Sequence, residues 1–131
     1  MAGGSGSPIR HFIQDVLGCG CPEEVFRRIE TRALSRDGVP LTRIEVGGRL
    51  LVEVFDTDDA GQAAAHLPRW VAAVVAERDA RGFNRARIVI ATGEPGRMQA
   101  RVQDAFDTVP GRDERTHLHV VDRGVCRWHT T

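Results

Sequence analysis

Two cysteines lie two residues apart near the start of the chain, in the run Cys19-Gly-Cys-Pro-Glu-Glu at residues 19–24. Thiolates are nucleophiles and ligands for soft metals, and the thiol pKa falls near the N-terminus of a helix. Pro22 suits the first position of a helix, which would make Cys21 the N-cap. The sequence therefore leaves two interpretations of Cys19 and Cys21 open: redox chemistry or metal binding, and inert thiols with a structural role.

A metal such as Zn²⁺ needs more ligands, because protein sites for this ion are usually tetrahedral. Cys126 and His129 lie three residues apart near the end of the chain and would complete the set with Cys19 and Cys21. His117 and His119 share one face of a predicted strand and are further candidate ligands. In the simpler alternative, Cys126 is a small buried apolar residue and His129 belongs to a terminal tail. The sequence leaves both interpretations open.

A second candidate site is the acidic run Phe55-Asp-Thr-Asp-Asp-Ala-Gly at residues 55–61. It resembles the strand-end DxDxxG segment of Toprim domains, which occur in primases and topoisomerases. The resemblance implies that Asp56 and Asp58 hold Mg²⁺ in an enzyme acting on nucleic acid or a phosphate ester. In the alternative interpretation, Asp58 or Thr57 caps the following helix and Asp59 complements the helix dipole.

Composition excludes several functions. The chain has 18 basic and 18 acidic side chains in 131 residues, so general nucleic-acid binding is not expected. Every basic residue is arginine and tyrosine is absent, which excludes a Schiff-base lysine, a P-loop lysine and a tyrosine acid. No apolar run approaches the roughly 20 residues that span a bilayer, and residues 1–7 lack the apolar stretch of a signal peptide. We expect a cytoplasmic protein with a flexible arm at 1–7 and a single domain at 8–131.

Hydrophobic periodicity predicts the elements that position these residues. Helices are expected at 8–17, 22–34, 60–81 and 97–109, and strands at 41–46, 49–55, 86–91 and 117–121. Gly47-Gly48 between the first two strands predicts an antiparallel hairpin, and the helices between the later strands predict parallel pairing. The expected fold is a single three-layer-like α/β domain. It has a mixed sheet of about four strands, built from the hairpin and a parallel βαβαβ unit, after two N-terminal helices.

Three functions follow as hypotheses. The first is a thiol-based protein that binds Zn²⁺ or another soft metal, or cycles redox state, at Cys19 and Cys21. The second is the Mg²⁺-dependent Toprim-like enzyme. The third is a non-catalytic protein-interaction module with an apolar surface patch around Phe12 or Trp128. In open α/β sheets ligands bind beyond the carboxyl ends of the strands, which here carry segments 56–59, 92–96 and 122–126.

Overall fold

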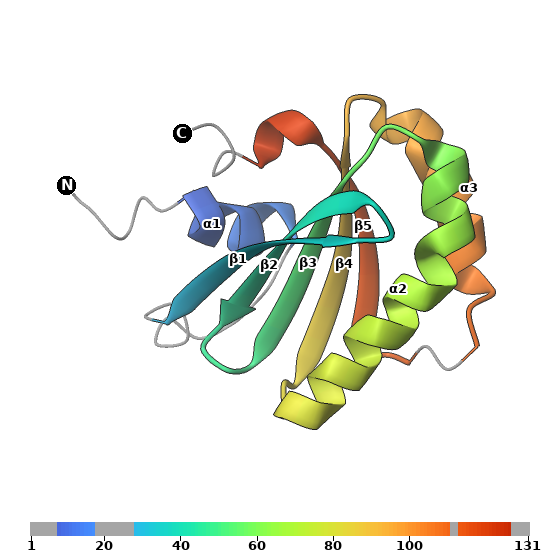
Figure 1. Cartoon of the computed structure of the whole chain (residues 1–131). Helices are drawn as coiled ribbons and strands as arrows, with labels where there is room; N and C mark the ends of the chain where they lie inside the picture. The colour runs from blue at the N-terminus through green and yellow to red at the C-terminus, as the bar shows by residue number, and fades with distance from the viewer. Residues whose placement is uncertain (1–7, 18–27, 111–112, 127–131) are drawn as a thin grey trace.

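The computed structural model describes residues 8–17, 28–110 and 113–126 (Figure 1). In chain order the elements are α1 (Pro8–His11), the π-helical turn η2 (Phe12–Val16), β1 (Ile29–Arg36), β2 (Val39–Val46), β3 (Leu50–Asp56), α2 (Ala60–Arg81), β4 (Arg85–Thr92), α3 (Pro95–Asp107), β5 (Thr116–Asp122) and the 3₁₀-helix η4 (Arg123–Val125). None of the described helices is long and apolar enough to cross a membrane.

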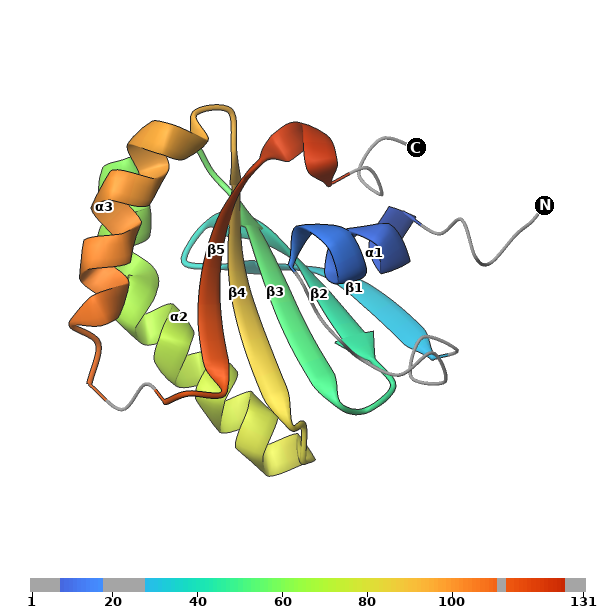
Figure 2. The same ribbon diagram turned by 180° about the vertical axis from the view of Figure 1, so that it is seen from behind.

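The strands form one mixed sheet in the order β1-β2-β3-β4-β5. β1, β2 and β3 are antiparallel neighbours, whereas β3, β4 and β5 are parallel. Helices α2 and α3 cover one face of the sheet, and α1 with η2 lies on the other (Figures 1 and 2). The α/β class, the antiparallel hairpin and the parallel pairing are therefore confirmed.

Two expectations about the fold are wrong. The sheet has five strands rather than about four, and the second N-terminal helix expected at 22–34 is strand β1 from Ile29 onward. Residues 22–27 of that expected helix lie outside the described part of the chain. Asp37 and Gly38 form the β1–β2 turn with φ of 53° and 80°, the positive values that a type I′ hairpin requires. The Asp-Gly pair was the signal for this hairpin, and pairing with β2 overrides the helical spacing of Ile29, Ala33 and Leu34.

The sheet separates two apolar layers. The larger layer lies beneath α2 and α3 and includes Trp70, whose ring stacks on Phe55 with centroids 4.1 Å apart. The indole N–H of Trp70 donates to a carboxylate oxygen of Asp37 at 3.1 Å, which ties the β1–β2 turn to α2. The smaller layer lies beneath α1 and η2, around Phe12 and Ile13.

Helix α2 begins and ends at residues with clear capping geometry. The carboxylate of Asp59 accepts a hydrogen bond from the main-chain N–H of Gln62 at 2.9 Å, so the N-cap is Asp59 rather than Asp58 or Thr57. Gly82 ends the helix in the left-handed conformation, with φ of 75°. Pro68 lies within the helix, which nevertheless continues as one element through it.

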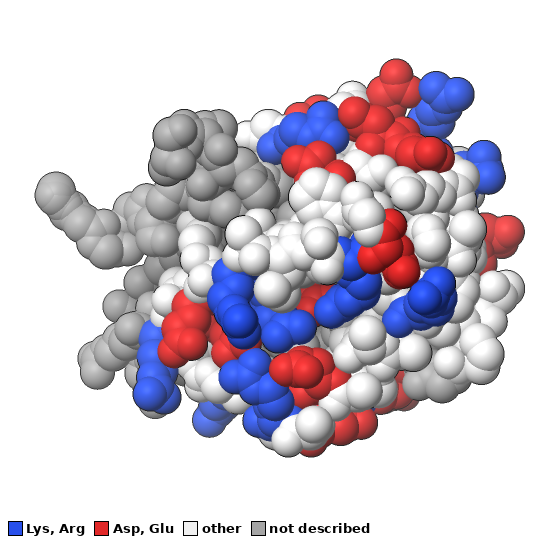
Figure 3. Space-filling view, in the orientation of Figure 1, with Lys and Arg blue, Asp and Glu red and all other residues white. Residues whose placement is uncertain are grey.

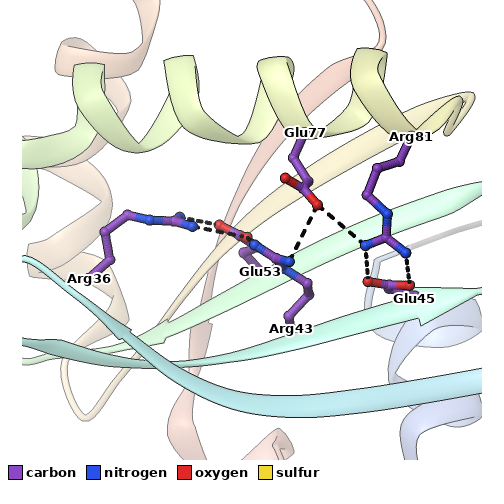
Figure 4. A network of polar contacts seen from close by, with 6 residues as sticks. All are labelled: Arg36, Arg43, Glu45, Glu53, Glu77 and Arg81. Carbon is purple, nitrogen blue, oxygen red and sulfur yellow. Dashed lines mark hydrogen bonds and ion pairs between the residues drawn. The ribbon is translucent and has the colours of Figure 1, made fainter.

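A network of arginines and glutamates lies between α2 and the first three strands (Figure 4). At its centre is Glu53 of β3, whose side chain is 0% exposed and contacts Arg36 and Arg43. Arg43 also lies 3.5 Å from Glu77, which joins Arg81 and Glu45 to the same network. Positive and negative side chains are interspersed over this face of the molecule (Figure 3), so the charges here are locally balanced.

We predict that Glu53→Gln lowers the free energy of unfolding by about 3 kcal/mol, because it breaks a buried ion pair and leaves two arginines without their shared counter-charge. Urea denaturation measures the loss. The control is Glu94→Gln, since Glu94 pairs with Arg97 where both side chains are mostly exposed. That variant should lose less than about 1 kcal/mol. Equal losses for the two variants would contradict the prediction.

Candidate functional site

The carboxyl ends of β3, β4 and β5 bring together three segments distant in sequence, as the parallel topology predicts. Arg123, which follows β5, lies between Asp56 and Asp58, which follow β3. Its Nε donates to Asp56 Oδ1 at 2.8 Å, and its Nη2 lies 3.1 Å from Asp58 Oδ1. The two carboxylates expected to bind Mg²⁺ are thus adjacent, with a guanidinium between them.

Asp58 accepts further hydrogen bonds from the residues that follow β4. The hydroxyl of Thr92 donates to it at 2.9 Å and the main-chain N–H of Gly93 at 2.8 Å. These donors lower the pKa of the Asp58 carboxyl, the Gly93 N–H most, then Thr92 and Arg123. Within the described residues, no group of three or more histidine, cysteine or acidic side chains is placed to hold a metal ion. The guanidinium of Arg123 places a positive charge between the carboxylates of Asp56 and Asp58.

An open hollow of about 450 Å³ adjoins Asp58 between the N-terminal ends of α2 and α3. It is lined by Asp58, Asp59, Ala60, Gly61, Arg97, Ala100 and Arg101. Two carboxylates and two guanidiniums share this lining, so the hollow carries no strong net charge. The N-terminus of α2, which borders the hollow, is already capped by Asp59.

Three of the six candidate thiol and metal ligands lie outside the described residues. Cys19, Cys21 and His129 all fall there, and so does Trp128. Cys126 is described and is 1% exposed. Burial, followed by the charge of Asp56, raises the pKa of the Cys126 thiol to about 11, so the neutral thiol is the stable form. Phe12, expected at an apolar surface patch, is 0% exposed and belongs to the core.

His117 and His119 lie on the same face of β5, as expected, and their neighbours there are arginines of β4. Arg87 is level with His117 in the β4–β5 register, and its Nη1 lies 2.7 Å from His119 Nε2. Because a guanidinium has only donors, His119 Nε2 is the acceptor and the ring is neutral. Burial and the nearby Arg87 lower the pKa of His119 to about 4, which agrees with this assignment.

Arg87 differs from the other arginines that the structure describes as buried or half-buried. Those are Arg36, Arg43, Arg78 and Arg123, and each contacts a carboxylate. Arg87 contacts the neutral ring of His119, and its buried Nε has no hydrogen-bond partner within the described part of the chain. Burial and the charge of Arg85 lower the pKa of Arg87. The β4–β5 face with His117 and His119 thus carries a half-buried cation that contacts no carboxylate among the described residues.

From the sequence, Arg87 was one of several arginines able to receive an anionic ligand, and it was not singled out as a site residue. The available signal was an arginine inside the otherwise apolar strand Ala-Arg-Ile-Val-Ile-Ala, residues 86–91, opposite the alternating His-Leu-His of residues 117–119. Comparison of the chain with protein-family models, curated proteins and solved structures finds no match. Function is therefore inferred from the geometry of the described residues.

We predict that Arg123→Gln creates a stabilising response to Mg²⁺, because it leaves Asp56 and Asp58 adjacent without their guanidinium. Thermal unfolding with and without Mg²⁺ measures the response. The midpoint should rise with Mg²⁺ in Arg123→Gln and stay nearly constant in the original chain. The triple variant that adds Asp56→Asn and Asp58→Asn should lose the response. An equal rise in the original chain would contradict this prediction and support the Mg²⁺ hypothesis.

We also predict that Cys126 is the slowest of the three cysteines to react with an alkylating reagent at neutral pH. Its thiol is buried and its raised pKa leaves little thiolate, whereas the thiolate is the reactive form. Timed alkylation followed by peptide mass spectrometry measures the three rates, with urea-unfolded protein as the control in which they converge. Protection of Cys19 and Cys21 that a chelator removes would reveal a bound metal. Fast labelling of Cys126 in the native protein would contradict its burial.

Proposed function

We propose that this chain is a protein-interaction module that binds an acidic segment of a partner protein on the face formed by β4 and β5. The observation that carries the proposal is Arg87, a half-buried guanidinium that contacts no carboxylate among the described residues. Arg85, His117 and His119 lie beside it on the same face, given the alternation of side chains and the β4–β5 register.

Arg87 has no carboxylate partner among the described residues, and a charge in that setting is costly to bury. A guanidinium removed from water loses hydration, and an ion pair or charge-assisted hydrogen bonds must offset that loss. The other buried and half-buried arginines of the described chain meet this need internally. A carboxylate from outside the domain would do the same for Arg87, with the bidentate geometry that arginine favours.

The position of the face supports an external partner. Viewed from behind, α1 and η2 lie toward the β1–β3 side of the sheet, and no described helix lies over the lower halves of β4 and β5 (Figure 2). From His117 to Val121 every residue of β5 is half-exposed. A peptide carboxylate fits this setting better than nucleic acid, because the patch is small and the whole chain has zero formal net charge.

The thiol hypothesis and the Mg²⁺ hypothesis stay proposals that rest on sequence. The first depends on Cys19 and Cys21, which lie outside the described residues. The second depends on Asp56 and Asp58, whose carboxylates already contact Arg123. The alkylation and Mg²⁺ experiments above test these two hypotheses independently of the β4–β5 face.

Binding is tested with a short fluorescein-labelled peptide in which glutamate alternates with valine. Fluorescence anisotropy should show saturable binding to the original chain and at least about tenfold weaker binding to Arg87→Met, a loss of about 1.4 kcal/mol. Arg97→Met is the matched control, because Arg97 is an exposed arginine on the other side of the sheet, and it should bind as the original chain does. Tighter binding of a labelled oligothymidylate than of the peptide would overturn the assignment to a protein segment.

The same variant separates a binding role from a structural one. Arg87→Met should leave the free energy of unfolding unchanged or raise it, because an apolar side chain of similar length replaces a half-buried charge that has no carboxylate partner among the described residues. Arg78→Met is the comparison, since Arg78 is 1% exposed and forms a bidentate pair with Asp113 at 2.8 and 2.7 Å. It should lose about 3 kcal/mol. A comparable loss in Arg87→Met would show that Arg87 serves the fold.

A further inference from the structure

Strand β5 is an edge of the sheet, because within the described residues only β4 pairs with it. An edge strand presents unpaired main-chain N–H and C=O groups, and proteins usually protect such edges with proline, a charged side chain at the centre or a bulge. The seven residues Thr116–Asp122 include no proline, and their one charged residue is the final Asp122. They pair in unbroken register with β4. The outer edge of β5 therefore has none of these three protections.

The register identifies which main-chain groups point outward. The N–H of Ala86 in β4 donates to the carbonyl of Arg115, just before β5, at 2.9 Å. The odd-numbered residues of β5 therefore direct their main-chain N–H and C=O groups toward β4. Alternation along the strand then directs the N–H and C=O groups of Leu118 and Val120 away from the sheet. These groups form the row to which another strand would bind.

The side chains of β5 also alternate in character. Leu118 and Val120 lie on the helical side, where they are half-exposed and pack against the apolar layer beneath α3. His117 and His119 lie on the opposite side, next to Arg87. Residues directly opposite each other on neighbouring strands point to the same face. A strand added to β5 would thus place one set of side chains against apolar surface and the alternate set against Arg87 and the histidines.

We propose that the acidic partner segment binds as an additional strand along β5, with apolar residues toward α3 and acidic residues toward Arg87. This inference rests on the proposed function and adds the mode of binding and the pattern of the ligand. Main-chain hydrogen bonds supply affinity and the alternating side chains supply specificity. A second copy of this chain is a poorer occupant, because pairing of β5 with β5 brings two Arg87 clusters to one face without a carboxylate between them.

The main-chain contribution is tested with Val120→Pro, which removes the outward N–H, and Val120→Ala, which keeps that N–H and shortens the side chain. A proline is tolerated where the N–H faces away from the sheet. Val120→Pro should weaken binding of the alternating glutamate–valine peptide at least about tenfold relative to Val120→Ala, as measured by anisotropy. Equal affinities of the two folded variants would overturn strand addition. If Arg87→Met still weakened binding, the proposed acidic-segment function would stand without it.

A peptide-side experiment covers the case in which Val120→Pro fails to fold. The peptide is N-methylated either at all its valines or at all its glutamates, and both versions are titrated against the original chain. Only alternate N–H groups of an added strand face β5, so one version should lose binding and the other retain it. The version that loses binding reports whether the added strand is parallel or antiparallel. Equal binding of the two versions would overturn the proposal, and concentration-dependent dimerisation of the free chain through β5 would assign the edge to a second copy.

Discussion

The need to neutralise charge inside a small domain governs much of this structure. Glu53 lies at the centre of β3 with no exposed surface, and it is compatible with the apolar layer around Trp70 only because Arg36 and Arg43 contact its carboxylate. Those two arginines come from β1 and β2, so one buried charge links the three antiparallel strands beneath α2. An unpaired carboxylate there would cost more than the packing of one large side chain contributes. The placement of the β1–β2 hairpin is thus coupled to that of α2.

The same constraint is met at two other places by contacts between distant parts of the chain. Arg78, near the end of α2, forms an ion pair with Asp113, which precedes β5 in the chain. Its Nη1 also donates to the hydroxyl of Thr116, the first residue of β5. Arg123 after β5 binds Asp56 after β3, which closes the carboxyl edge of the sheet. Each arginine is matched by a carboxylate more than 30 residues away in sequence. Charge pairing here specifies tertiary arrangement as well as stability.

The sequence predicted those parts of the fold that local patterns determine. The glycine pair at 47–48, the long apolar stripe of α2 and the buried strand around Val89 led to the hairpin and the parallel unit. Strand β1 was missed because Ile29, Ala33 and Leu34 also fit a helix, and only pairing with β2 decides between the two. The convergence of Asp56 and Asp58 with segment 122–126 followed from topology. That Arg123 would lie between the two carboxylates depends on side-chain geometry that no spacing encodes.

Arg87 shows why the candidate binding face was harder to find. An arginine in a strand is unremarkable in sequence, since its long side chain usually reaches solvent or a carboxylate. It becomes informative only when the structure shows a half-buried guanidinium beside a neutral histidine and another arginine, with no carboxylate in contact among the described residues. Among the described residues, the buried charge of the β1–β3 half of the sheet is balanced by ion pairs, whereas Arg87 on the β4–β5 half contacts no carboxylate. Because Arg87 lies beside β5, which within the described residues pairs only with β4, an acidic segment of the proposed kind would satisfy both the charge and the outward main-chain groups.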